Sequence, residues 1–115
     1  MTNMNCIFCQ IVNGDLPSTM LYEDDRVVVF KDIAPKAPVH LLVVPRAHVK
    51  NLEEAGGAQG ALLGHMIAVA AKVAADAGIA ASGYRVALNN GLDAGQVVFH
   101  LHLHVLGGRR LGDMG

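Results

Sequence analysis

Three histidines stand at alternate positions near the end of the chain: His100, His102 and His104. They interrupt an otherwise apolar run over 97–106, and strict alternation of this kind predicts a β-strand whose side chains leave opposite faces in turn. Because such a strand rises about 3.3–3.4 Å per residue, neighbouring imidazoles would lie roughly 6.6–7 Å apart in one row. Three titratable rings on one face need water, partners or a ligand. We therefore interpret the row as a functional site rather than as three unrelated structural histidines.

Two kinds of chemistry suit this row of imidazoles. A metal ion could bind between two of them, because imidazole is a common metal ligand. Alternatively, one imidazole attacks a phosphorus atom while its neighbours bind negative charge, and water then hydrolyses the P–N bond that forms. The segment 91–96 before the row contains two glycines, and its backbone N–H groups could point at an anion. These surroundings favour transfer of a phosphoryl or nucleotidyl group.

The two cysteines, Cys6 and Cys9, form a single Cys-x-x-Cys pair. The first five residues lack the basic start and apolar core of a secretory signal peptide, so we expect a cytoplasmic protein. In a reducing compartment this spacing favours metal binding or redox chemistry over a structural disulfide. Redox motifs of this type follow a strand, and no strand is expected before Cys6. Metal binding is the favoured interpretation, and an unliganded pair of thiols stays open.

Composition and charge limit the domain organisation and the partners. The chain has 115 residues, of which 52% are hydrophobic, so we expect one globular domain over residues 1–115. A formal net charge of −1 offers no electrostatic attraction for nucleic acid or an anionic membrane. No uninterrupted apolar stretch approaches the ~18 residues of a membrane-spanning helix. We therefore expect neither nucleic acid nor a membrane as a partner.

The elements that must position these residues follow from hydrophobic periodicity. Helical spacing of apolar residues predicts a short helix over 4–13 and a long helix over 59–77. His65 lies beside the apolar face of the long helix and is expected to be an ordinary surface histidine. Strands are expected at 21–22, 27–30, 39–44, 84–88 and 97–106. In the last strand the residues expected to face the core are Phe99, Leu101, Leu103 and Val105. This order indicates an α+β domain with a mainly antiparallel sheet.

The segment 95–109, Gly-Gln-Val-Val-Phe-His-Leu-His-Leu-His-Val-Leu-Gly-Gly-Arg, resembles the His-x-His-x-His-x-x signature of the histidine triad (HIT) proteins. It is similar in particular to the Hint branch, the nucleoside phosphoramidases. The resemblance continues through 30–40, 44–48 and 83–85 in collinear order and so covers nearly the whole chain. It implies a HIT fold, with a five-stranded antiparallel sheet, one long and one short helix, and a sheet extended across a two-fold homodimer.

The resemblance also implies roles for individual residues. His102 is expected to be the nucleophile that becomes nucleotidylated at the α-phosphate, and His40 to lie behind it and fix its tautomer. His104 and backbone amides at 95–97 would hold the phosphate oxygens. Asp32 would accept from the ribose hydroxyls, although a turn-stabilising aspartate is the alternative interpretation. The implied nucleotide-binding residues are Phe8, Ile11, Phe30, Asp32, Ile33, Asn89, Gly95, Gln96, Val97, His102 and His104.

The same resemblance gives the cysteine pair a partner set. Many bacterial Hint-like proteins bind a structural zinc with a Cys-x-x-Cys pair and two histidines, which match His48 and His100 here. Four such ligands close a tetrahedral site and leave no position for a catalytic water. The implied zinc is therefore structural and is held by Cys6, Cys9, His48 and His100. No catalytic metal is expected, and His100 is removed from the chemistry.

Two departures from the family pattern bear on the rate and the substrate. Val97 stands where members of this branch usually carry a hydroxyl residue, which can assist the leaving group or bind a phosphate oxygen. Valine cannot donate a hydrogen bond, and the loss of one such donor can cost a few kcal/mol. The usual Trp-Pro-Pro-Gly tail is also replaced, because the chain ends with 109–115. This tail shapes the leaving-group pocket, so substrate preference is affected while the nucleophile is not.

The activity implied is hydrolysis of purine nucleoside 5′-phosphoramidates or acyl-adenylates through a nucleotidyl-histidine intermediate, with an AMP- or GMP-type product. Three alternatives stay open. The chain could act on dinucleoside polyphosphates, or it could be a nucleotide-binding HIT protein with vestigial activity. The third alternative is a metalloenzyme that uses the histidine row directly, and chelation would abolish its activity.

Overall fold

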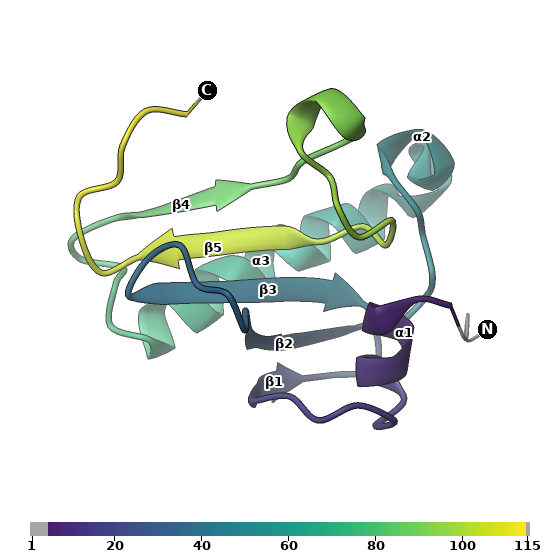
Figure 1. Cartoon of the computed structure of the whole chain (residues 1–115), viewed down its shortest axis with the longest axis horizontal. Helices are drawn as coiled ribbons and strands as arrows, with labels where there is room; N and C mark the ends of the chain where they lie inside the picture. Colours follow the sequence, from purple (N-terminus) through teal and green to yellow (C-terminus); the bar gives the residue numbers. More distant parts are fainter. Residues whose placement is uncertain (1–4, 115) are drawn as a thin grey trace.

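The computed structural model describes residues 5–114 and arranges them as an antiparallel sheet with a long helix along one face (Figure 1). The strands are β1 (Met20–Glu23), β2 (Val27–Lys31), β3 (Val39–Pro45), β4 (Tyr84–Ala87) and β5 (Leu103–Gly107), in the spatial order β1-β2-β3-β5-β4. The helices are α1 (Ile7–Val12), α2 (Leu52–Ala55) and α3 (Gly60–Asp76). Single 3₁₀ turns lie at η1 (Gly57–Gln59) and η2 (Leu92–Ala94). The expected five-stranded antiparallel sheet with one long and one short helix is confirmed, and α2 with the two 3₁₀ turns adds to it.

Alternation along the central strands divides their side chains between two apolar clusters. The side chains on the α3 face form the main core and include Val27, Val29, Leu41, Val43, Leu103 and Val105. Those on the opposite face pack with α1 and include Val28, Phe30, Leu42 and Val44. Because successive side chains of a strand point to opposite faces, His104 and Leu106 of β5 belong to the α1 side of the sheet. The two-residue period of β5 thus directs core side chains toward α3 and His104 toward the opposite face of the sheet.

The long helix α3 covers one face of the sheet with a single apolar stripe. Leu62, Met66, Val69 and Val73 are buried in the main core, as their helical spacing predicts. Residues 57–76 are long and apolar enough to cross a membrane by length and composition, and packing of this stripe against β3 and β5 accounts for that composition. His65 lies on the helix surface with its Nε2 2.7 Å from Asp24 Oδ2.

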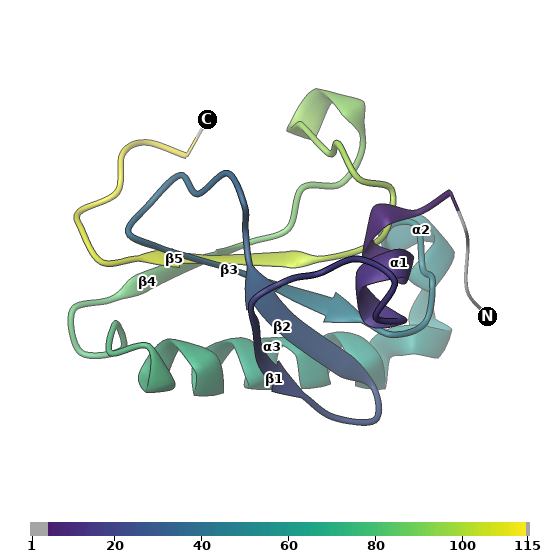
Figure 2. The same cartoon turned by 60° about the horizontal axis from the view of Figure 1, so that its bottom comes forward.

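The face of the sheet opposite α3 carries the loops that build the site. Figure 2 shows α1, the loop after β2, the segment between β4 and β5, and the C-terminal segment on this face. The C-terminal segment is held by two arginines: Arg85 donates to the Gly112 carbonyl at 2.8 Å, and Arg109 donates to the Lys36 carbonyl at 2.9 Å. Loops that lie far apart in the sequence therefore meet over β3 and β5.

Two expected boundaries are wrong, both next to the site. The last strand begins at Leu103 rather than at 97, because residues 97–102 lie outside the ladder, and Phe99 is 37% exposed instead of facing the core. The N-terminal helix begins at Ile7 rather than at 4, with Cys6 as its N-cap, and the Ile7 side chain is 43% exposed. Met4, in the expected first turn, lies outside the described residues.

Candidate active site and metal cluster

A cavity of about 610 Å³ opens on the face of the sheet opposite α3. Its volume suits a small-molecule ligand. Every residue expected to bind nucleotide lines it except Gln96: these are Phe8, Ile11, Phe30, Asp32, Ile33, Asn89, Gly95, Val97, His102 and His104. His40 lines it as well, whereas His100 does not. The cavity therefore separates the histidine row into two members that face it and one that does not.

One end of the cavity is an apolar slot. Phe8 of α1 meets Phe30 of β2 edge-on, with ring centroids 5.6 Å apart, and meets His102 at 5.0 Å with perpendicular rings. Ile11 and Ile33 complete the slot; Ile33 is 92% exposed, so it forms the rim. Flat apolar walls of this kind suit a planar aromatic group, and they place it next to His102.

The ring of His102 is held with one nitrogen committed and one free. Its Nδ1 lies 2.7 Å from the His100 carbonyl oxygen, and because a carbonyl can only accept, Nδ1 carries the proton. Nε2 therefore has the lone pair of the neutral ring. Within residues 5–114, every buried side-chain nitrogen or oxygen has a hydrogen-bond partner. Nε2 of His102 has no partner, so it is not buried and is open to the cavity. Burial lowers the pKa of His102 and favours this neutral, nucleophilic form.

The expectation that His40 lies behind His102 is wrong. His40 Nε2 lies 2.8 Å from His104 Nδ1 instead, and the orienting group on His102 is the backbone carbonyl of His100. The β3–β5 register is the reason, because His40 pairs with Leu106 and Leu42 pairs with His104. That register places His40 on the far side of His104 from His102.

Asp32, His40 and His104 form a compact cluster at the floor of the cavity, with potential ligand atoms within 4.8 Å of one another. Asp32 Oδ2 lies 3.4 Å from His40 Nε2, and its Oδ1 accepts from the Ala34 N–H at 2.9 Å. Asp32 thus stabilises a turn, as its alternative interpretation required, while also lining the cavity. Burial lowers the pKa of His40, and burial beside His102 and His40 lowers that of His104 to about 4.

This cluster is nevertheless a poor metal site. His40 Nδ1 accepts a hydrogen bond from the Lys36 N–H at 3.0 Å, so the proton of the neutral ring is on Nε2, the atom that a metal would need. Metal-binding histidines instead donate their second ring N–H to a carbonyl or a carboxylate. The hydrogen-bond pattern therefore opposes metal binding at Asp32, His40 and His104.

The second cluster has the opposite pattern and fits zinc. Cys6 Sγ lies 3.3 Å from His100 Nδ1, Cys9 Sγ lies 3.3 Å from His48 Nδ1, and Cys9 Sγ lies 3.5 Å from His100 Nδ1. Tetrahedral zinc with typical bond lengths separates sulfur and nitrogen ligands by about 3.5 Å. The four expected ligands Cys6, Cys9, His48 and His100 therefore come together with donor atoms in suitable positions.

The surroundings of the metal cluster support the same conclusion. His100 is fully buried, and its Nε2–H donates to the Pro45 carbonyl at 2.8 Å, which leaves the Nδ1 lone pair facing both thiols. Burial raises the pKa of the Cys6 thiol and lowers that of His100 to about 4. A cation bound to the deprotonated thiols would compensate this burial.

The loop before β5 is organised by Gln96, which was expected to bind nucleotide. The Gln96 side chain is buried, accepts from the Gly91 N–H at 2.8 Å, and donates to the Lys50 carbonyl at 2.9 Å. The backbone N–H groups of Gly95 and Gln96 donate to Leu92 and Gly91 carbonyls inside the loop. The expectation that these two amides hold phosphate is therefore wrong, and among 95–97 only the Val97 N–H has no partner in the described part of the chain.

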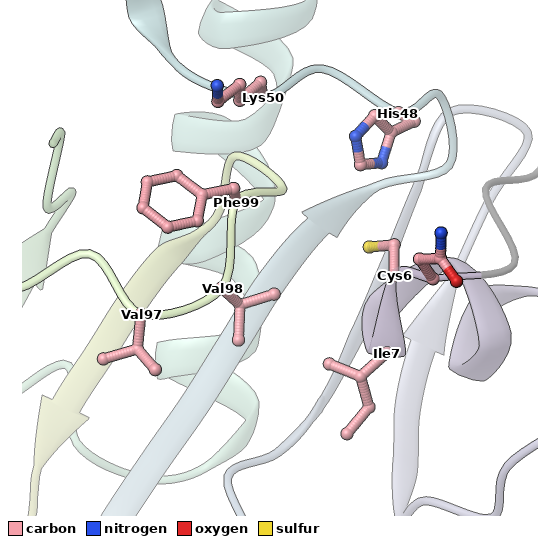
Figure 3. Close-up of a pocket in the computed structure, with 8 residues that line it drawn as sticks. Cys6, Ile7, His48, Lys50, Val97, Val98 and Phe99 are labelled. Atoms are coloured by element: carbon pink, nitrogen blue, oxygen red, sulfur yellow. The ribbon is translucent and has the colours of Figure 1, made fainter.

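A second, smaller cavity of about 450 Å³ adjoins the first. Figure 3 shows Val97 and Val98 on the loop before β5, opposite Ile7 of α1, with His48 and Cys6 beyond them. Ile7, Val97 and Val98 line both cavities. Val97, where the resemblance led us to expect a hydroxyl residue, is 84% exposed at this junction and presents only methyl groups to it.

The large cavity also has lining residues that were not expected from the sequence, among them Lys36, Arg85 and Met114. Lys36 takes part through its backbone N–H, a role that no side-chain pattern signals. Arg85 and Met114 also line the large cavity. The Arg85 bond to Gly112 brings the C-terminal segment to its edge. The unusual tail was the signal for Met114, and Arg85 follows from it only once the topology is known.

Comparison with known proteins adds an independent line of support. A model of the HIT domain matches residues 13–111. The chain is 44% identical over 108 residues to the purine nucleoside phosphoramidase of Escherichia coli K12, which covers 94% of this chain and 91% of that protein. A HIT family hydrolase from Clostridium thermocellum superposes with a TM-score of 0.94 at 49% identity over 97% of each chain. A zinc-bound histidine triad family protein from Mycobacterium smegmatis gives a TM-score of 0.80 at 33% identity, over 97% of this chain and 81% of its own.

Proposed function

The chain belongs to the HIT family and is a hydrolase of that family, and from this premise we propose that it hydrolyses purine nucleoside 5′-phosphoramidates and acyl-adenylates. The observation that carries the proposal is the tautomer of His102. Its proton is held on Nδ1 by the His100 carbonyl, and its Nε2 lone pair faces a cavity with an apolar slot. The E. coli relative, named for purine nucleoside phosphoramidase activity, supports the substrate class.

In the proposed reaction, His102 Nε2 donates its lone pair to the α-phosphorus, the Nε2–P bond forms, and the P–N bond to the amine breaks. The amine leaves with the electrons of that bond and takes a proton from solvent. Water then attacks the phosphorus, the Nε2–P bond returns its electrons to the ring, and the water proton returns to solvent. The Nδ1–H stays bonded to the His100 carbonyl, which stabilises the positive ring of the intermediate.

The cavity supplies binding groups for each part of the substrate. The slot formed by Phe8, Phe30 and Ile33 takes the purine, and Asp32 accepts from the ribose hydroxyls. His104 and the Val97 N–H bind phosphate oxygens, while Asn89 lines the phosphate or leaving-group side. Because residue 97 is a valine and not a hydroxyl residue, proton delivery to the amine relies on solvent, which predicts a modest rate.

The zinc in this proposal is structural. Cys6, Cys9, His48 and His100 hold it, and a closed set of four ligands leaves no open position for substrate or water. Its effect is to tie α1, which carries Phe8, to the end of β3 and to the segment before β5. The zinc-bound M. smegmatis relative supports the presence of a metal in this fold.

The proposed assembly is a homodimer. The sheet ends at β4, an edge strand with unpaired backbone groups on one side, and such edges are commonly covered. Ile67 on α3 and Val86 on β4 are 53% and 37% exposed. Light scattering coupled to gel filtration tests this assembly: a two-chain mass is expected, and a monomer at micromolar concentration contradicts it.

The activity is tested by comparing kcat/KM for an adenosine 5′-phosphoramidate with kcat/KM for a dinucleoside polyphosphate. We expect the phosphoramidate to be the better substrate by at least about tenfold. The reverse order would favour the polyphosphate hydrolase. AMP binding without turnover of either compound would indicate a binding protein. Loss of activity on brief chelation would favour the metalloenzyme.

A further inference from the structure

The smaller cavity, of about 450 Å³, has no role in the proposed reaction, although its volume is within the range of small-molecule sites. It joins the large cavity where Ile7, Val97 and Val98 line both. At the end away from Ile7, the side chains of Lys50 and Phe99 lie side by side (Figure 3), and the Lys50 ammonium is 5.6 Å from the centre of the Phe99 ring. This end of the cavity combines an apolar surface with a positive charge.

Hydrogen bonds to the backbone hold the two walls of the smaller cavity together. The Val49 carbonyl accepts from the Leu101 N–H at 2.6 Å. The Gln96 side-chain nitrogen donates to the Lys50 carbonyl at 2.9 Å and to the Val98 carbonyl at 3.3 Å. The Lys50 side chain is exposed, but its backbone is thereby fixed against the loop before β5. The cavity is therefore preformed and does not depend on a ligand.

Lys50 supplies the net charge of this cavity. Among the described lining residues, Cys6 and His48 are the other titratable groups, and they belong to the metal cluster, where two thiolates balance the charge of a zinc ion. Lys50 Nζ forms no ion pair with a carboxylate of residues 5–114. The Glu54 carboxylate accepts from the backbone N–H of Lys50 instead, at 3.1 Å. The positive charge therefore favours a ligand with an anionic group.

Val97 connects this cavity to the reaction. Its N–H is assigned to a phosphate oxygen in the proposed function, so the bond that breaks at the α-phosphorus lies next to the junction of the two cavities. We propose that the smaller cavity binds the leaving group, and that Lys50 selects leaving groups that carry an apolar side chain and a carboxylate. The preferred substrate is then a nucleoside 5′-phosphoramidate whose nitrogen is the amino group of an amino acid. This inference rests on the proposed function and adds no step to it, because the amine still leaves with the electrons of the P–N bond and takes a proton from solvent.

Binding to a chain that lacks the nucleophile tests this site directly. Two adenosine 5′-phosphoramidates are compared by calorimetry, one made with phenylalanine and one with phenylalanine amide, which has the same shape without the negative charge. In zinc-loaded His102→Ala we expect the carboxylate compound to bind about fivefold more tightly, as for one partly exposed ion pair, with a smaller advantage in about 0.5 M salt. Adding Lys50→Met should abolish the advantage, and adding Lys50→Arg should keep it. Equal affinities in His102→Ala, or an advantage that persists with Lys50→Met, would overturn the proposal.

Lys72 provides a matched control for the loss of a lysine. Its ammonium lies 5.9 Å from the centre of the Tyr22 ring, but it is on α3 and lines neither cavity. Lys72→Met should leave the advantage unchanged, and its loss there would contradict a specific role of Lys50. Arg85 lines the large cavity and is a competing cation. Loss of the advantage in Arg85→Met, with persistence in Lys50→Met, would place the carboxylate beside β4 and overturn the assignment.

Amide spectra and turnover separate this inference from the proposed function. In ¹H–¹⁵N correlation spectra of His102→Ala, the phenylalanine compound should shift the signals of Lys50 and Phe99, whereas AMP should not. Unshifted signals would show that the leaving group lies elsewhere. In the wild type, the ratio of kcat/KM for the two compounds should follow the ratio of their affinities. Turnover of neither compound would contradict the proposed function, while the affinities and spectra would still decide whether the smaller cavity binds the carboxylate.

Discussion

The protein contains two histidine clusters, one along β3 and β5 and one at the segments that follow β3 and precede β5. The hydrogen-bond partner of the second ring nitrogen distinguishes them. In the metal cluster, the second nitrogen of His100 donates to the Pro45 carbonyl, so a lone pair faces the thiols. In the cavity cluster, the second nitrogen of His40 accepts from the Lys36 amide, so an N–H faces His104. Both clusters bring three or four potential ligands within 4.8 Å, yet only the first presents lone pairs where a cation would bind.

This contrast shows that a backbone group can assign the chemistry of a histidine. Three imidazoles at equal spacing along one segment are proposed to take different roles: His100 binds metal through Nδ1, His102 attacks through Nε2, and His104 binds a phosphate oxygen. Carbonyl oxygens fix the first two rings, and a peptide N–H fixes the third through His40. Spacing alone could not distinguish these roles, because it is identical for all three.

The sharpest way to break the comparison is to remove the nucleophile. We expect His102→Ala to lose at least about 10⁴-fold in kcat for an adenosine phosphoramidate, with AMP affinity within about tenfold of the wild type, because the slot and the other phosphate-binding groups remain. Steady-state turnover and isothermal titration calorimetry measure the two effects. Residual turnover above about 1% of wild type would remove His102 from its role.

A substitution in the metal cluster should lower stability and leave kcat nearly unchanged, in contrast to His102→Ala. Cys9→Ser removes a thiolate ligand, so the zinc content should fall and the melting temperature should drop by more than about 10 °C, since a ligand at 1,000 times its Kd contributes about 4 kcal/mol. The kcat of the fraction that stays folded should remain within about threefold of the wild type. Elemental analysis, calorimetry and turnover at 15 °C report these quantities. A large loss of kcat in folded protein would show that the metal acts in the chemistry.

The pH dependence of stability sharpens the distinction for His104. Its pKa is about 4 in the folded protein against about 6.5 when unfolded, so the unfolded chain binds more protons between these values. The free energy of unfolding should therefore fall as the pH decreases from 6.5 towards 4, with one site contributing at most about 1.4 kcal/mol per pH unit. Urea unfolding of wild type and His104→Gln from pH 4.5 to 7.5 checks this. The variant should show a shallower slope, and parallel curves would contradict the assigned shift.

The smallest expected effect on kcat comes from substitutions at Val97, which lines both cavities. Val97→Ser should restore a hydroxyl next to the leaving group and raise kcat for a phosphoramidate by about two- to tenfold. Val97→Ala is the matched control, because it removes the same methyl groups without adding a donor, and its kcat should stay near that of the wild type. An equal gain in both variants would mean that space and not the hydroxyl limits the rate.

The alternation over 97–106 predicted much of the site, because Leu101, Leu103 and Val105 are buried in the core while the imidazoles leave from the other side. It was wrong at Phe99, where the chain leaves the ladder and His100 lies against the thiols. The structure brings ten of the eleven residues that the resemblance implied for nucleotide binding around one cavity, and the four implied zinc ligands into one cluster. It paired His40 with the wrong histidine, because strand register depends on hydrogen bonds between distant segments that a single sequence does not encode as a spacing. The engaged amides around Gln96 were missed for a similar reason.

The most direct test of the account is a rapid-quench experiment with excess adenosine 5′-phosphoramidate, followed by mass spectrometry of the digested protein at alkaline pH, where P–N bonds survive. The account predicts a transient adenylyl group on the peptide that contains His102, located by fragmentation to that residue and absent from His102→Ala. An adenylyl group on His104 or His40, or turnover in the first milliseconds without any covalent adduct, would contradict it.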